Sequence, residues 1–187
     1  MDERRDPYGA VIAADLAVRV EPQMRVASLR HLDPRGAFAQ RCRTVFGVDL
    51  PPALGAMSLP GAALGQQCIL AWRHPTTTLL LDTDGAAFDA LLRELPPTED
   101  GCCVDQSGGW WALRTTGARV PDLLLRIGNA AAVAPIGHAH MSRMADLPVM
   151  SLCVRPREWL LLVDRAYAEH LLDWIRVTVA DFAGAAG

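Results

Sequence analysis

Residues 101–111, GCCVDQSGGWW, place two adjacent cysteines, a carboxylate and a hydroxyl close together in the chain. A reactive thiol needs exposure and a lowered pKa, usually beside a cation or a helix N-terminus. The carboxylates near Cys102 and Cys103 raise a thiol pKa instead, and no CxxC pair suggests redox or zinc chemistry. We therefore predict unreactive thiols and a turn in which Asp105 and Ser107 hydrogen-bond to the local backbone.

Two other patterns could carry chemistry, and both are weak. Ser107, His138 and Asp105 supply the residue types of a hydrolase triad, but the G-x-S-x-G turn that exposes such a serine is absent. His138 and His140 project to one face if they lie on a strand, which makes two metal ligands, with Asp146 as the nearest third. We predict no catalytic residue and no metal, and keep His138 and His140 as weak metal candidates.

Composition narrows the function classes further. The 187 residues carry a net charge of -3, and all 18 basic side chains are Arg, so a Lys Schiff base and a P-loop Lys are excluded. No clustered basic stripe indicates nucleic-acid binding, and no apolar run is long enough to span a membrane. The N-terminus lacks a secretory pattern, and the cysteines are odd in number, so we expect a reduced cytoplasmic protein.

The elements that position these residues occur in the same order twice. Each half shows an alternating strand, a helix, a hairpin and an amphipathic helix. The first set covers residues 24–32, 33–46, 68–82 and 85–95, and the second covers 109–116, 118–128, 149–164 and 166–182. Asp33 and Pro34 are expected to open the first helix, Gly47 to end it, and residues 47–67 to form a loop.

An offset of 81 residues relates the two halves. It carries Pro75 of one hairpin turn onto Pro156 of the other, the three leucines 79–81 onto 160–162, and Ala87 onto Ala168. Such internal similarity indicates one supersecondary unit used twice. We predict an α+β fold of duplicated strand-helix-hairpin-helix units with antiparallel sheets, divided into an N-terminal arm (1–22) that could add an edge strand, a first repeat (23–97) and a second repeat (98–187).

Tryptophan is abundant for a chain of this size. Five of these rings are too many to bury easily in one small domain, so we expect some to lie at an interface with a partner. Trp110 and Trp111 are neighbours on a predicted strand, so one should enter the core while the other faces water or a partner. Trp72 is the third interface candidate.

These segments together resemble a known family. VDQSGGWWALRTTGARVPDLLLRIG, followed by a Gly/His/Arg loop and EWLLLVDRAYAEHLLDWI, is similar to the gamma-subunit family of heterotetrameric sarcosine oxidase. VASLRHL, FGVDLPPALGAMSLPG and ILAWRHPTTTLLL extend the likeness over roughly residues 15 to 182. His74 and Thr76 depart from the family's Gly-Pro-acidic turn, Thr78 replaces its Trp, and the loop 129–148 is short.

The resemblance implies an aminomethyltransferase-like fold with duplicated ferredoxin-like units. It also implies an accessory, non-catalytic subunit that packs against larger alpha-type and beta-type chains of an amine-oxidising complex. It implies FAD, FMN, NAD and tetrahydrofolate for that complex and no cofactor on this chain. The alternative is a stand-alone folate-binding or one-carbon transfer protein, which needs a pocket carboxylate to accept hydrogen bonds from the pterin ring. Asp105, Glu158 and Asp164 are the weak candidates for that role.

Overall fold

The computed structural model describes residues 10–59, 68–82 and 88–184, and these form two compact units. The β3 unit contains Gln23–Gly108 and Gly137–Ala139. The β8 unit contains the described residues up to Pro22, together with Gly109–Ile136 and the chain from His140 onward. Within the described residues, no helix has the length and apolar character needed to cross a lipid bilayer.

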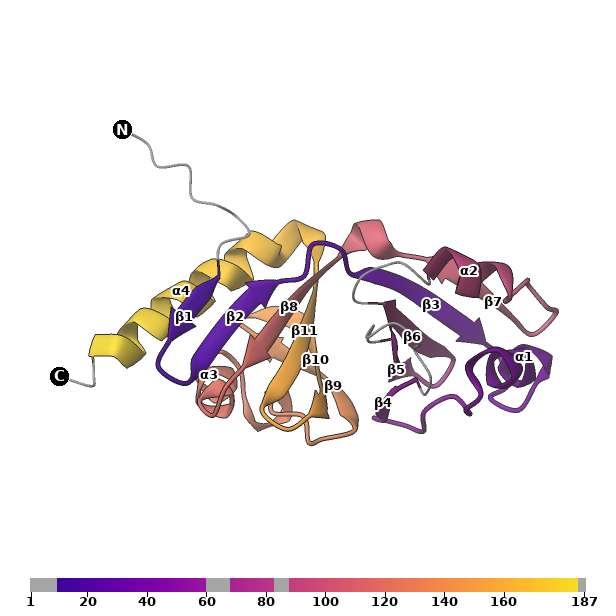
Figure 1. Cartoon of the computed structure of the whole chain (residues 1–187), viewed down its shortest axis with the longest axis horizontal. Coiled ribbons are helices and arrows are strands. Elements are labelled where there is room, and N and C mark those ends of the chain that lie inside the picture. The colour runs from indigo at the N-terminus through magenta and orange to yellow at the C-terminus, as the bar shows by residue number, and fades with distance from the viewer. Residues whose placement is uncertain (1–9, 60–67, 83–87, 185–187) are drawn as a thin grey trace. The chain divides into compact units, whose positions relative to one another are not determined.

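The β3 unit is built on one antiparallel sheet and two helices (Figure 1). Its elements in chain order are β3 (Arg25–His31), α1 (Ala37–Phe46), β4 (Ala56–Ser58), β5 (Cys68–His74), β6 (Thr77–Asp82), α2 (Phe88–Arg93) and β7 (Gly101–Asp105). The strands lie side by side in the order β4-β5-β6-β3-β7. This is the strand arrangement of a ferredoxin-like unit with β4 added at one edge.

The core of the β3 unit follows from the periods of its elements. Phe38, Cys42 and Phe46 recur every fourth residue of α1 and bury one face of the helix. They pack against alternate strand residues, including Leu29 of β3 and Leu80 of β6. As predicted, α1 ends at Gly47, whose φ of 72° suits a residue without Cβ. The helix begins later than predicted, however, because Asp33 hydrogen-bonds to the Arg35 amide instead of the helix.

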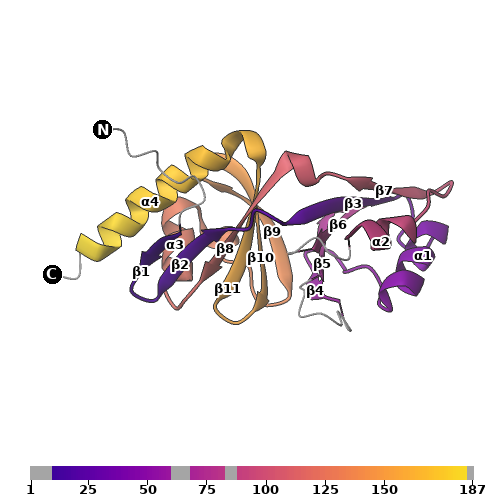
Figure 2. The same cartoon turned by 45° about the horizontal axis from the view of Figure 1, so that its top comes forward.

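The β8 unit repeats this plan (Figure 2). Its elements are β1 (Val11–Ala13), β2 (Leu16–Val20), β8 (Trp110–Thr116), α3 (Val120–Ile127), β9 (His138–Met144), β10 (Leu147–Arg155), β11 (Glu158–Asp164) and α4 (Ala168–Gly184). The first residues of β9, His138 and Ala139, belong to the β3 unit. The sheet order is β1-β2-β8-β11-β10-β9. Apolar side chains of α3 and α4, such as Leu124 and Ile175, fill its core.

The two sheets confirm the predicted α+β fold with antiparallel, duplicated units. β4-β5-β6-β3-β7 corresponds position by position to β9-β10-β11-β8-β2. The hairpins β5-β6 and β10-β11 turn at the matched prolines Pro75 and Pro156, and the matched leucines 79–81 and 160–162 are all buried. Ala87, the remaining matched position of the first half, lies outside the described residues.

The unit boundaries differ from the predicted ranges at two places. Residues 98–108, which the sequence assigned to the second repeat, lie in the β3 unit because β7 pairs with β3. Residues 11–20, which were expected as a separate arm with an edge strand, lie in the β8 unit, where β1 is the edge and β2 pairs with both β1 and β8. β4 also forms inside the segment predicted as a loop. Strand pairing is a long-range choice, and a short strand carries little pattern of its own.

Candidate functional site

The stretch GCCVDQSGGWW passes from one unit to the other. Its cysteines lie within a strand, β7, which the sequence did not predict, and the predicted strand follows them as β8. Cys103 pairs with Leu29 and Cys102 with Arg30 of β3. A single 3-10 turn at Ser107–Gly109 then leads directly into β8.

Burial raises the pKa of the Cys103 thiol in this stretch. Cys103 packs against the core of the β3 unit, and burial, Cys102 and Asp105 together raise the pKa of its thiol to about 12. Burial and the neighbouring Cys103 likewise raise the pKa of Cys42 to about 12. None of the five cysteines forms a disulfide. Because the thiolate is the nucleophilic form, this raised pKa supports the predicted lack of reactivity at Cys103, which stays a prediction.

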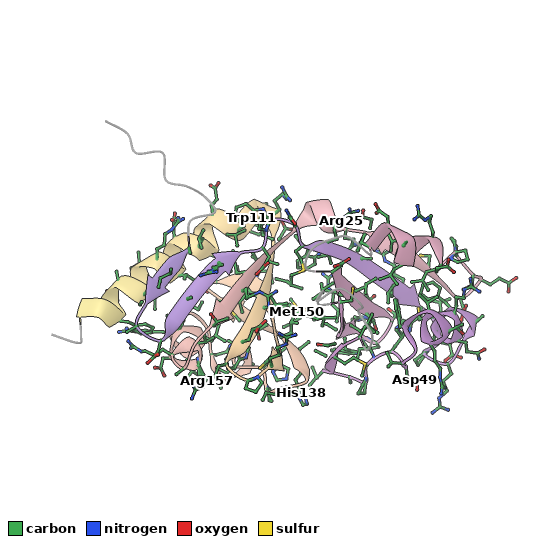
Figure 3. The ribbon with its side chains drawn as sticks, in the orientation of Figure 1. Arg25, Asp49, Trp111, His138, Met150 and Arg157 are labelled. Atoms are coloured by element: carbon green, nitrogen blue, oxygen red, sulfur yellow. The ribbon has the colours of Figure 1, made fainter. Side chains whose placement is uncertain are left out.

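Asp105 and Ser107 form a hydrogen-bonded turn organised by Arg25, which is labelled in Figure 3. The Asp105 carboxylate accepts from the Ser107 amide (2.8 Å) and hydroxyl (2.6 Å). Arg25 donates from Nε to the Ser107 hydroxyl (3.0 Å) and from Nη2 to Asp105 (3.0 Å). The same Nη2 lies 3.2 Å from Asp89 of α2, and the guanidinium covers the Phe88 ring at 4.5 Å.

This network sets the protonation of Asp105. Burial opposes ionisation, but the hydrogen bonds from Ser107 and the Arg25 guanidinium outweigh it and hold the pKa of Asp105 below its usual range. The predicted turn is confirmed for Asp105, whose carboxylate accepts from the Ser107 amide, whereas the Ser107 hydroxyl accepts from the Val26 amide of β3. The sequence missed Arg25, which stands 80 residues before Asp105 and could be linked to it only through the β3–β7 pairing.

The three carboxylates named as alternatives for a pterin contact are each engaged in local contacts. Glu158 and Asp164 stand at opposite ends of β11, roughly 20 Å apart along an extended strand. Glu158 forms an ion pair with Arg114, which also binds Glu21 at 2.5 Å. Asp164 accepts a hydrogen bond from the Ala166 amide at the start of the last helical segment (2.9 Å). Each carboxylate, Asp105 included, thus makes a local structural contact, and its role toward a pterin stays a prediction.

The two weak metal candidates also lack a completed ligand set. His138 is exposed at the first residue of β9, and the ring nitrogen Nδ1 of His140 lies 3.2 Å from the Ala131 carbonyl oxygen. Asp146, the nearest predicted third ligand, pairs with Arg143 at 3.6 Å. Among the residues that the structure describes, no three His, Cys, Asp or Glu side chains are grouped as a metal site requires.

The tryptophans divide into buried and accessible groups. Trp111 packs against the core of the β8 unit, and the alternation of β8 directs the half-buried Trp110 to the opposite face. Trp159 is buried and donates from Nε1 to the Ala134 carbonyl oxygen (2.9 Å). Trp72 is half-buried, while Trp174 of α4 is half exposed. Trp174 is therefore the most exposed of the five tryptophans. The interface role of Trp72, Trp110 and Trp111 stays a prediction.

The last helix presents a second apolar strip besides the one that fills the core. Trp174 and Val177 of α4 are 50% and 61% exposed, and their spacing of three residues keeps them on one side. Tyr167, 48% exposed, extends the strip from the 3-10 turn that precedes α4. Because an amphipathic helix normally exposes polar residues here, the strip is the clearest apolar surface on α4. The sequence already indicated this strip, because Trp174 and Val177 fall outside the face of α4 that fills the core.

The fold described above defines the class of protein. It is shared with the glycine cleavage system aminomethyltransferase T of Bartonella henselae, with a TM-score of 0.66 and 11% identity over 86% of this chain and 45% of that one. A chain of heterotetrameric sarcosine oxidase from Corynebacterium sp. U-96 superposes with a TM-score of 0.77 and 21% identity over 97% of both chains. The chain thus has an aminomethyltransferase-like fold.

Sequence comparison points to a particular family within that class. The chain is 26% identical over 159 residues to a sarcosine oxidase subunit gamma of Corynebacterium sp. (strain P-1), which covers 83% of this chain and 75% of that protein. It is 24% identical over 179 residues to the subunit gamma of an Arthrobacter species, covering 94% and 83%. No family model matches. The resemblance to the gamma-subunit family of sarcosine oxidase is confirmed.

Proposed function

We propose that this chain is an accessory, gamma-type subunit of a multi-subunit oxidase acting on sarcosine or a related N-methyl amine. The observation that carries the proposal is the similarity to two gamma subunits over most of the chain, together with a fold match along 97% of a chain of the heterotetrameric enzyme. The larger flavin-containing subunits, alpha-type and beta-type, are its partners. FAD, FMN, NAD and tetrahydrofolate are assigned to those subunits and not to this chain.

The surface of the chain is consistent with a role in assembly. The strip of Tyr167, Trp174 and Val177 exposes large side chains of the kind that dominate binding energy at protein interfaces. Trp72, Trp110 and Trp111 remain proposed as further contact residues. The five cysteines, none of which forms a disulfide, support a cytoplasmic location, where thiols stay reduced.

Co-production with the larger flavin-containing subunits tests the proposal. We expect the tagged chain to elute from a sizing column with those subunits in a fixed ratio, and to be less stable or to aggregate when produced alone. A chain that elutes alone as a monodisperse monomer, in the presence of the larger subunits, would contradict an accessory role.

Calorimetric titration of the isolated chain with tetrahydrofolate tests the alternative of a stand-alone folate-binding protein. We expect no saturable heat, because Asp105, Glu158 and Asp164 are each engaged in local contacts. Saturable binding that is lost in a variant of one of these carboxylates would support the alternative instead.

A further inference from the structure

β1 is an edge strand without the usual protection. Among the described residues it pairs only with β2, so the backbone donors and acceptors on its other side face outward. Natural edge strands are commonly guarded by charged side chains, proline or a bulge. The three residues of β1 are Val11, Ile12 and Ala13, and the Ile12 side chain is 67% exposed. Such an edge is a template for another strand.

A groove runs beside this edge. It has a volume of about 510 Å³ and is lined by residues of β1 and its turn, by α4 and by the start of α3: Val11, Ile12, Ala13, Ala14, Arg119, Arg176, Val179, Ala180 and Phe182. Figures 1 and 2 both show α4 alongside β1. A strand added to β1 would therefore have one face beside α4, where Ala180 is exposed and the edges of Val179 and Phe182 line the groove.

The charge of this β1–α4 groove is one-sided. Among the described residues, Arg119 and Arg176 are the ionisable residues of the lining, and none of the lining residues is a carboxylate. Arg176 lies 3.0 Å from Asp173 and Arg119 lies 3.7 Å from Asp122, both outside the lining. A guanidinium has five N–H donors, so one neighbouring carboxylate leaves donors for another. Arg119 is also held over the Phe182 ring at 4.2 Å, which fixes its position at the groove.

We propose that the β1–α4 groove receives an extended segment of a larger partner subunit, apolar on one face and carrying carboxylates, which adds as a strand to β1. The segment is extended because it pairs with the edge of β1. One of its faces is apolar because it packs beside α4, and its carboxylates pair with Arg119 and Arg176. A second copy of this chain is a poor occupant, because its own β1 contains no acidic residue and would bring the same arginines. The inference rests on the proposed function, since it requires larger subunits.

Photo-crosslinking in the assembled complex tests the position of the partner segment. A benzophenone amino acid in place of Ile12 is expected to crosslink to a segment of a larger subunit that contains acidic and apolar residues. The same amino acid in place of Leu125, which is 51% exposed on α3 and outside the groove, is the control. Crosslinks from position 12 only to residues 1–9 of this chain or to a second copy, or no excess over position 125, would overturn the proposal.

Charge reversal tests the chemistry of the groove. Arg176→Glu is expected to weaken association with the larger subunits by about tenfold, because it places a like charge against the partner's carboxylates. Arg143→Glu, which changes an exposed arginine of β9 outside the groove, should leave the affinity within about twofold. Both variants are first shown by thermal unfolding to be folded.

The outcomes separate this inference from the proposed function. If the unaltered chain does not associate with the larger subunits, the proposed function fails and the groove inference falls with it. If it associates but Arg176→Glu and Arg143→Glu behave alike, the accessory role stands and the groove is not the docking site.

Discussion

At the scale of single residues, Asp105 and Ser107, which suggested a catalytic site in the sequence, form structural hydrogen bonds with Arg25. Arg25 joins three elements, since its guanidinium contacts Ser107 after β7, Asp105 within β7 and Asp89 on α2. A carboxylate and a hydroxyl 2.6 Å apart could be read as an activated pair. Here the hydroxyl donates to the carboxylate while accepting from Arg25, so both are held in a turn.

Replacing Arg25 should therefore cost stability. Arg25→Leu keeps the apolar stem but removes the ion pairs and the cation–π contact, and we expect a loss of about 1–2 kcal/mol in the free energy of unfolding. Urea denaturation measures it. Arg143→Leu, which removes an exposed pair with Asp146, should cost less than about 0.5 kcal/mol. Equal losses in the two variants would mean that the Arg25 network adds nothing beyond a surface charge.

The buried thiols give a prediction on reactivity. With pKa values of about 12, Cys42 and Cys103 have a thiolate fraction of about one in 10,000 at pH 8. They should react with a disulfide reagent in the folded protein far more slowly than after unfolding in urea, and faster as the pH rises. Mass spectrometry of the labelled peptides identifies each site. Labelling of Cys103 in the folded protein at the rate of a free thiol would show that the strand does not protect it.

At the scale of elements, the N-terminus of α1 is capped by the carboxylate of Asp100, a residue far along the chain. The Phe38 amide donates to Asp100 (3.1 Å), where a capping side chain would normally come from the residue before the helix. The hydroxyl of Thr98 and the backbone amides of Phe38, Asp100 and Ala37 together hold the pKa of Asp100 below its usual range, against the opposing effect of burial. The helix and β7 are thus fixed to each other by an ionised group.

Asp100 should make stability depend on pH in the acid range. Because its folded-state pKa lies below the unfolded value of about 3.8, its contribution is complete above that value and is lost as the pH falls through the folded pKa. Asp100→Asn should flatten this acid dependence, measured by thermal unfolding against pH.

Burial lowers the pKa of His31 while Asp100 and Asp33 raise it, so an NMR titration of the Asp100→Asn variant should give a still lower His31 pKa. A His31 pKa unchanged in the variant would place Asp100 too far away to act.

The approach of β7 to α1 requires a residue without a side chain. A Cβ on Gly101 would lie 2.5 Å from the Arg30 carbonyl oxygen and 2.6 Å from the Phe38 Cβ. Gly101→Ala should therefore destabilise the protein by about 1–3 kcal/mol, as overpacking does. Gly108→Ala is the matched control, because nothing lies within 4 Å of its Cβ and no positive φ is recorded there, and its effect should stay within about 0.5 kcal/mol. Equal values in a denaturant series would refute the close contact.

Local pattern was sufficient for the long elements and insufficient for the short ones. The hairpins and α4 were predicted from alternation and helical period, since each buries a continuous apolar face. β4 has three residues and β7 begins with Gly101 and two cysteines, so neither shows a clear period. The lack of thiol reactivity stays a prediction, and its argument needs only neighbours in sequence. The Arg25 network and the β1–α4 groove could not, because both depend on pairings between distant segments.

At the scale of the whole molecule, the two units complete their sheets in different ways. The β3 unit takes its last strand, β7, from the residues that follow α2, whereas the β8 unit takes the equivalent strand, β2, from the start of the chain. The chain therefore enters the β8 unit, leaves to form the β3 unit and returns through residues 109–110. This connectivity explains why an N-terminal arm in sequence is an interior strand in the sheet.

The N-terminal strand should consequently be essential to a unit that lies mostly in the second half of the chain. Leu16 of β2 is 2% exposed within the core of the β8 unit. Leu16→Ala should cost about 2–5 kcal/mol, because it leaves a cavity there, whereas Leu125→Ala in the same unit, at a side chain 51% exposed, should cost less than about 1 kcal/mol. Amide hydrogen exchange should show the larger loss of protection in β8, which pairs with β2, than in β6 of the β3 unit. Equal loss in both strands would show that the units unfold as one and that β2 has no special place in the β8 unit.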